Sequence, residues 1–111
     1  MAASFPKKGD FIFVDFDPQS GHEQQGRRPA LVISNTAFNK RTGMVFVCPI
    51  TNRDRNFPFH VPVNDAKNIT GFVMVEQVKS IDFHARNAQT VGKASEALLE
   101  EVLALLDACV Y

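Results

Sequence analysis

The sequence lacks a long apolar run, and its first ten residues lack the hydrophobic stretch of a secretory signal. A membrane-spanning helix and export by such a signal are therefore not expected, and the location that we expect is the cytoplasm. Cysteine is also scarce: Cys48 and Cys109 have no paired spacing and no histidine cluster nearby. This excludes a zinc site of the usual spacing, and both thiols are expected to be buried and free.

The chain carries no net charge, because twelve Lys and Arg residues balance twelve Asp and Glu residues. Neutrality at first argues against a nucleic-acid partner, since nucleic-acid-binding domains usually present a basic surface. The charges are unevenly placed, however. All twelve basic residues lie between Lys7 and Lys93 with eight acidic ones, and four acidic residues follow. The body is therefore +4 and the last segment −4, which fits a basic binding face or simply a solvated acidic helix.

A length of 111 residues with 45% hydrophobic content predicts one domain, spanning residues 1–111, with a single core. A chain this short leaves much of its surface exposed. Burying one face against an identical copy is therefore a natural source of stability, and a homodimer is plausible on size alone.

Short segments rich in Phe, Ile and Val predict strands at 10–16, 30–34, 44–51, 57–63 and 71–78. Pro58 and Pro62 mark the fourth of these as an edge or bulged strand. Short strands joined by turns with Gly and Pro indicate a mainly β protein, with an antiparallel sheet or a small barrel.

Two helices and one long loop complete the expected organisation. Residues 17–28 have no apolar periodicity and are expected to form a loop. A turn of helix is expected at 35–43, ending at Gly43. From Ser95, leucines and Val102 recur at three- and four-residue spacing, which predicts an amphipathic helix capped by Ser95 and packed over one side of the sheet.

The densest group of polar side chains is GHEQQGRRP, residues 21–29, at the end of the expected loop. Binding and catalytic groups are often carried by loops held between strands. A flexible polar connector would have a similar composition. The segment nevertheless combines a possible base, His22 or Glu23, with the fixed cation Arg28 and several amides.

Three motifs resemble those of the MazF/PemK family of toxin endoribonucleases from type II toxin-antitoxin systems. They are DFDPQSGHEQQGRRPALVIS, then CPIT followed by FPF, and finally EQVKSID, in the family's order and with similar spacing. GHEQQG is closest to the PemK branch, whereas RTGM, FPF and QVKS are closer to the MazF branch. The resemblance implies a small SH3-like antiparallel β-barrel of the CcdB/MazF-like fold with a C-terminal α-helix. It also implies a homodimer, a cognate antitoxin, and sequence-specific cleavage of single-stranded RNA (mRNA) without metal or cofactor.

The same resemblance assigns the functional residues by position. Those of the family correspond to Glu23 and Arg28 in the loop, Thr51 at the end of the third strand, and Gln77 and Lys79 in EQVKS; His22 corresponds only to the PemK branch. Two positions depart from the family pattern. Glu76 stands where the family often has Asp, and Met74 stands where PemK-like members use Arg nearby.

The chemistry can be derived from the side chains themselves. Metal-free RNA cleavage uses the 2′-hydroxyl as nucleophile and gives a 2′,3′-cyclic phosphate and a 5′-hydroxyl. Arg28 suits the phosphorane, because a guanidinium stays protonated and matches phosphate oxygens bidentately. We expect Thr51 to donate to the phosphate and Glu23 or His22 to act as base, with no acid assigned. His22, Gln77 and Lys79 are expected in catalysis or in RNA binding.

Further RNA contacts are expected from five basic residues, with Phe57 offering a ring on which an unpaired base stacks. The basic residues are Arg27, Lys40, Arg41, Arg53 and Arg55. Solubility charges and a core or turn Phe explain these residues equally well. We expect His60 and His84 to be ordinary surface residues.

Two other functions remain open. Gyrase-poisoning toxins that resemble CcdB share the expected fold, but they depend on a Trp near the C-terminus, and this chain has no Trp. The other alternative is a non-catalytic barrel of the same fold that binds RNA.

Overall fold

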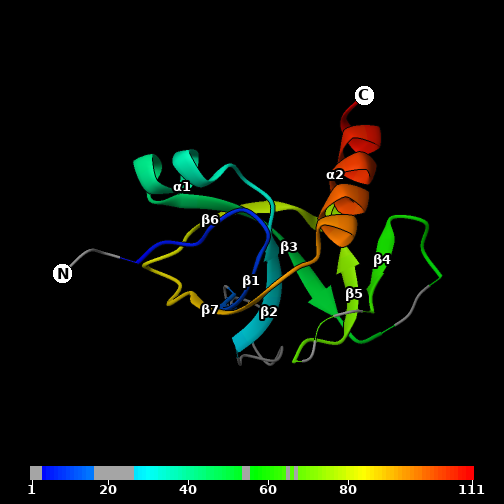
Figure 1. Ribbon diagram of the computed structural model, residues 1–111, viewed down its shortest axis with the longest axis horizontal. Helices are drawn as coiled ribbons and strands as arrows, with labels where there is room; N and C mark the ends of the chain where they lie inside the picture. Colours follow the sequence, from blue (N-terminus) through cyan, green and yellow to red (C-terminus); the bar gives the residue numbers. More distant parts are fainter. Residues whose placement is uncertain (1–3, 17–26, 54–55, 65, 67) are drawn as a thin grey trace.

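The computed structural model describes residues 4–16, 27–53, 56–64, 66 and 68–111. Within them the strands are β1 (Asp10–Asp15), β2 (Arg27–Val32), β3 (Met44–Thr51), β4 (His60–Val63), β5 (Gly71–Met74), β6 (Lys79–Asp82) and β7 (Gln89–Lys93). The helices are α1 (Thr36–Thr42), the 3-10 turn η1 (Val75–Gln77) and α2 (Glu96–Val110). The protein is thus mainly β with a C-terminal helix, as the sequence predicts (Figure 1).

The strands form one antiparallel sheet in the order β4-β5-β3-β2-β1-β7, and β6 pairs with β3 outside this path. The long strand β3 pairs with two further strands: Ile50 and Thr51 pair with β5, whereas Met44–Val47 pair with β6. η1 carries the chain from one partner strand to the other. The described strands therefore curve into a half-barrel with β4 and β7 at its two edges (Figure 1).

Both faces of the central strands are buried, because successive side chains of a strand point to opposite sides. On one side Leu31, Ile50 and Val73 belong to a cluster with Leu98 and Val102 of α2, and we call this side the α2 face. The opposite side has its own cluster, formed by Ile12, Val14, Ala30, Val32, Val45, Val47, Ile81 and Phe83. We call it the β6 face.

Helix α2 begins where the sequence predicts. The Ser95 hydroxyl accepts a hydrogen bond from the backbone N of Leu98 at 3.1 Å, a cap typically worth about 1 kcal/mol. Leu98 and Val102 are buried, and the remaining leucines of the stripe pack half-buried against the same core. In Figure 1, α2 stands beside β4 and β5, away from α1. None of the described helices has the length and apolar content that a membrane span requires.

Helix α1 also confirms the prediction. Asn35 caps its N-terminus by accepting hydrogen bonds from the backbone N of Ala37 and of Phe38. Gly43 ends it with φ 74°, a left-handed conformation that glycine adopts without steric cost.

Several predicted boundaries were wrong. Residues 71–78 form β5 and η1 rather than one strand, because β3 changes partner there. The strand expected at 57–63 begins at His60, and β6 and β7 were not predicted. The loop expected at 17–28 ends earlier, since pairing with β1 draws Arg27 and Arg28 into β2.

Candidate active site

Arg28 and Thr51 lie on neighbouring strands and point to the same face of the sheet. β2 and β3 pair with Ala30 opposite Pro49. Continuing this antiparallel register by two residues places Arg28 opposite Thr51. Side chains an even number of residues apart on a strand point to the same face. Arg28 is two residues from Ala30 and Thr51 is four residues from Val47, and both Ala30 and Val47 belong to the cluster of the β6 face. The side chains of Arg28 and Thr51 therefore project on the β6 face. Because opposite residues of paired strands have Cα atoms about 5 Å apart, a guanidinium and a hydroxyl there can reach the same anion.

The hydroxyl of Thr51 is oriented by the chain that follows it. Its Oγ1 accepts a hydrogen bond from the backbone N of Arg53 at 3.2 Å. A threonine hydroxyl has two lone pairs and one proton, so this contact leaves the proton available for another acceptor. Thr51 is therefore suited to donate to a phosphate oxygen.

Gly71 permits the close packing of β5 against the end of β3. It has φ 122°, and a Cβ built on it would lie 2.4 Å from the carbonyl oxygen of Thr51 and 3.0 Å from Oδ1 of Asn52. No real side chain fits at such a distance, so this position requires glycine. The position of Thr51 thus depends on a residue that the sequence did not single out.

Lys79 brings a second cation to the β6 face. It pairs with Val47 across the β3–β6 ladder, and its Nζ lies 5.1 Å from the centre of the Phe16 ring. Phe16 follows Val14, the pairing partner of Arg28, by two residues and packs in the same cluster. The ammonium of Lys79 therefore approaches the end of the sheet that holds Arg28. Gln77, in η1, is exposed.

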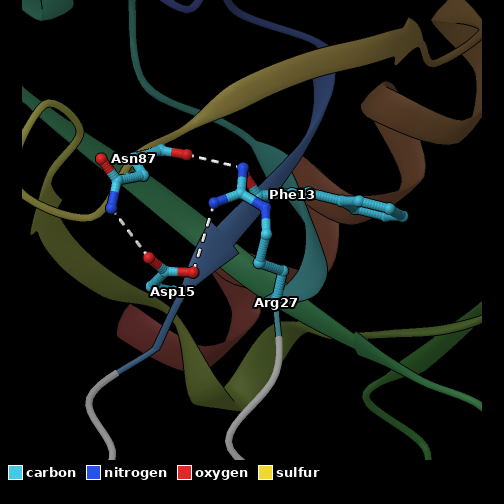
Figure 2. Close-up of polar contacts among 4 residues, drawn as sticks. All are labelled: Phe13, Asp15, Arg27 and Asn87. Carbon is cyan, nitrogen blue, oxygen red and sulfur yellow. Dashed lines mark hydrogen bonds and ion pairs between the residues drawn. The ribbon is translucent and has the colours of Figure 1, made fainter.

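Arg27 points to the opposite face and is held by protein groups. Its Nη1 donates to Oδ1 of Asp15 at 3.2 Å, and its Nη2 donates to the carbonyl oxygens of Phe13 at 3.0 Å and Asn87 at 2.6 Å. Asn87 completes the network by donating from Nδ2 to Oδ2 of Asp15 at 2.9 Å (Figure 2). These contacts tie β1 and β2 to the turn before β7, and Asp15 compensates the charge of Arg27.

Arg53 and Phe57 lie near opposite ends of the connection from β3 to β4. Arg53 is exposed and lies two residues after the end of β3. Phe57 is 43% exposed as a residue. Its ring packs on Phe59, with centroids 5.9 Å apart, and edge-on against His60 at 5.2 Å. Phe57 is thus a turn residue that presents part of its ring to solvent. Three residues expected in the site, His22, Glu23 and Arg55, lie outside the described residues.

The expectation that His60 is a surface residue was wrong. Its side chain is only 3% exposed, and Nε2 lies 3.1 Å from Oε2 of Glu76. The partners are 16 residues apart in the sequence, so nothing local to His60 indicates the pair. His84 is exposed, as expected.

The two cysteines differ. Cys48 is buried, and this burial, followed by the charge of Glu76 and the proximity of Cys109, raises the pKa of its thiol to about 12. Cys109 is exposed near the end of α2, contrary to the expectation, because it lies beyond Leu106, the last residue of the helix that packs against the core. Among the described residues, no three His, Cys, Asp or Glu side chains gather in a group that would hold a metal ion.

The half-barrel with its C-terminal helix, and a face that carries Arg28, Thr51 and Lys79, define a small β protein with a candidate site for an anion. The sequence model of the PemK-like, MazF-like toxins of type II toxin-antitoxin systems matches residues 7–110. The chain belongs to this family.

Similar proteins agree with this assignment. The chain is 47% identical over 109 residues to the endoribonuclease toxin ChpB of Escherichia coli K12, covering 94% of this chain and 93% of that protein. It is 38% identical over 102 residues to the endoribonuclease toxin MazF of the same strain, covering 92% and 91%. The crystal structure of a MazE-MazF complex (Form-II) from Deinococcus radiodurans superposes with a TM-score of 0.89 at 36% identity, over 97% of each chain.

Proposed function

We propose that the protein is a sequence-specific, metal-independent endoribonuclease toxin that cleaves single-stranded RNA, including mRNA. Its relatives ChpB and MazF, named endoribonuclease toxins, match more than nine-tenths of the chain. The observation that carries the proposal is the placement of Arg28 opposite Thr51, with Lys79 on the same face. Two cations and a hydroxyl donor form a site for a phosphodiester.

The reaction is a transesterification within the RNA. The 2′-oxygen attacks phosphorus, and a base takes the 2′-proton. The bond from phosphorus to the 5′-oxygen then breaks, which leaves a 2′,3′-cyclic phosphate and a 5′-oxygen that an acid protonates. Arg28 and Lys79 stabilise the charge of the phosphorane, and Thr51 donates to one of its oxygens. Glu23 or His22, from the segment of the chain between β1 and β2, supplies the base.

The remaining candidates bind the RNA strand. Arg53 lies two residues after Thr51 and contacts the neighbouring phosphate, with Arg55 two residues beyond it. Phe57 stacks an unpaired base. The guanidinium of Arg27 already donates hydrogen bonds to Asp15 and to two carbonyl groups. Arg27 therefore contributes to RNA binding by holding the start of β2 in place and through its remaining N–H donors.

The proposed toxin is inhibited by a cognate antitoxin. A MazF of similar fold has been crystallised with MazE. An acidic, disordered segment that folds on binding would occupy the positive field around Arg28 and Lys79, and would thus compete with RNA. We also propose that the chain acts as one domain over residues 1–111, as a homodimer, in the cytoplasm.

Incubation of the pure protein with a long single-stranded RNA in EDTA tests the proposal. We expect discrete fragments that carry 5′-hydroxyl and 2′,3′-cyclic phosphate ends, and 5′-end mapping then gives the recognition sequence. The control for Arg28→Ala is Lys93→Ala, which removes an exposed cation of β7. Lys93 pairs with Asp10, at the opposite end of β1 from Val14, the partner of Arg28. RNA that is bound but left intact in EDTA by the wild type would contradict the proposal and favour the non-catalytic alternative.

A further inference from the structure

The imidazole of His60 is buried in a pair that none of the proposed chemical steps uses. Its side chain is 3% exposed, and Nε2 lies 3.1 Å from Oε2 of Glu76, whose own side chain is 28% exposed. His60 begins β4 and Glu76 lies in η1. The pair therefore joins the turn before β4 to the segment that carries Gln77.

Stability alone does not account for a histidine at this position. Within the described part of the chain, Nδ1 of His60 is buried and has no hydrogen-bond partner. Leaving a buried polar atom unsatisfied costs roughly 1–3 kcal/mol, and an apolar side chain of similar volume would avoid this cost. Buried polar groups that weaken the fold are expected where they serve a function.

The pair sits at a junction between two segments that are proposed to bind RNA. The backbone N of His60 donates to the carbonyl oxygen of Phe57 at 3.0 Å, which closes the turn. The backbone N of Val75, in η1, donates to the carbonyl oxygen of Phe59 at 3.2 Å. The Phe57 ring packs edge-on against the imidazole at 5.2 Å. The imidazole thus contacts Phe57 on one side and Glu76, the neighbour of Gln77, on the other.

We propose that His60 and Glu76 are positioning residues that hold the Phe57 ring at a fixed distance from Gln77, so that an unpaired nucleobase stacks on the ring and presents its edge to the amide. This inference rests on the proposed function and identifies one site at which the enzyme recognises a base of its RNA substrate. A stacked base supplies affinity with little sequence preference, whereas an amide that can both donate and accept hydrogen bonds distinguishes one base edge from another.

The pair lies on other elements than Arg28 and Thr51, two of the residues proposed for the chemical step. The third, Lys79, follows Glu76 by three residues but is held in β6 by pairing with Val47 of β3. His60 lies opposite Met74 in the β4–β5 ladder, whereas Thr51 lies opposite Phe72 at the other end of β5. Loss of the pair should therefore weaken substrate binding and leave the chemical step intact.

The test compares kcat and KM for His60→Leu, Glu76→Ala and Glu76→Gln on a short RNA that contains the mapped cleavage sequence. We expect His60→Leu and Glu76→Ala to raise KM about tenfold, with kcat within about twofold of the wild type. Glu76→Gln should recover most of the affinity, because its amide oxygen can still accept from Nε2–H. His60→Leu should unfold at a temperature no lower than that of the wild type, and cleavage at near-cognate sequences should increase.

Two controls isolate the pair. His84→Leu removes an exposed histidine from the turn after β6, and Glu96→Ala removes an exposed carboxylate from the first turn of α2; neither should change KM. The double variant His60→Leu with Glu76→Ala should have the KM of either single variant, since one broken contact cannot be broken twice.

The outcomes separate the inference from the function on which it rests. A wild type that cleaves RNA, combined with a KM unchanged in both Glu76→Ala and His60→Leu, overturns the positioning role alone. So does a fall in kcat at constant KM, or a KM that rises additively in the double variant. Should His60→Leu fail to fold, the two Glu76 variants decide by themselves. A wild type that leaves RNA intact overturns the proposed function and this inference together.

Discussion

Arg27 and Arg28 are neighbours in the sequence, yet they project from opposite faces of β2. Arg27 pairs across the ladder with Asp15 and binds its carboxylate, whereas Arg28 pairs with Val14 and projects on the β6 face with Thr51. The alternation of a strand thus separates one guanidinium that holds the fold from one available for an anion. Removal of Arg27 should therefore weaken mainly the fold, and removal of Arg28 should weaken mainly cleavage.

We predict that Arg28→Ala lowers the single-turnover cleavage rate by about 10²–10³ or more, while the unfolding temperature stays close to that of the wild type. Arg27→Ala should instead lower the free energy of unfolding by about 1 kcal/mol, because its three hydrogen bonds are partly exposed, and should lower the cleavage rate far less. Single-turnover kinetics and thermal unfolding of both variants provide the comparison. A folded Arg28→Ala protein with normal turnover would remove Arg28 from the mechanism.

Gly71→Ala should damage the site through the backbone of Thr51. The added Cβ meets the Thr51 carbonyl oxygen, and φ 122° is strained for alanine, so we expect a loss of about 1–3 kcal/mol in stability together with slower cleavage. Gly43→Ala is the matched control. Gly43 also has a positive φ, but nothing lies within 4 Å of its added Cβ, so stability should fall while the cleavage rate of the folded protein is retained. Equal cleavage by both folded variants would contradict this role of Gly71.

The two thiols should react at very different rates. Cys109 is exposed, whereas Cys48 is buried and its raised pKa keeps it in the unreactive thiol form at neutral pH. In the native protein, titration with a disulfide reagent at pH 8 should modify one thiol quickly and the second only after unfolding. Cys109→Ser should abolish the fast reaction, and a fast reaction that persists in that variant would show that Cys48 is accessible.

Alkaline pH should destabilise the protein through Cys48. Burial, followed by the Glu76 charge, raises the folded-state pKa of this thiol to about 12, above its ordinary value of 9.0. The folded state therefore retains the proton that the unfolded state loses, so this contribution to stability is complete below pH 9.0 and is lost as pH rises toward 12. Denaturant unfolding between these limits should show a pH slope up to about 1.4 kcal/mol per unit steeper for the wild type than for Cys48→Ala. Parallel slopes would rule out this linkage.

Local chemistry was sufficient to predict several elements. Asn35, Gly43 and Ser95 terminate helices through contacts within a few residues, and β3 is a continuous apolar run. β7 was not predicted because it is an edge strand whose side chains are mostly exposed, so it shows no apolar alternation. The break at η1 was missed because it arises from β3 exchanging one partner strand for another, which no local pattern records.

The candidate site was predictable only in part. The resemblance identified Arg28, Thr51 and Lys79, and the pairing of β2, β3 and β6 brings them to one face. The bonds of Arg27 to Asn87 and of His60 to Glu76 span 60 and 16 residues, and each depends on strand register that composition does not specify. Gly71 has no sequence signal beyond being a glycine, since its importance comes from the backbone of Thr51 lying against it.

A double-mutant cycle on Arg28→Ala and Thr51→Val, measured by single-turnover cleavage of a short cognate RNA in EDTA, tests the central claim most directly. If both side chains act on one scissile phosphate, the two losses are coupled, and the double variant should be faster than the product of the single effects by about tenfold or more. Losses that multiply independently would show that Arg28 and Thr51 do not share a phosphate, and would contradict the site described above.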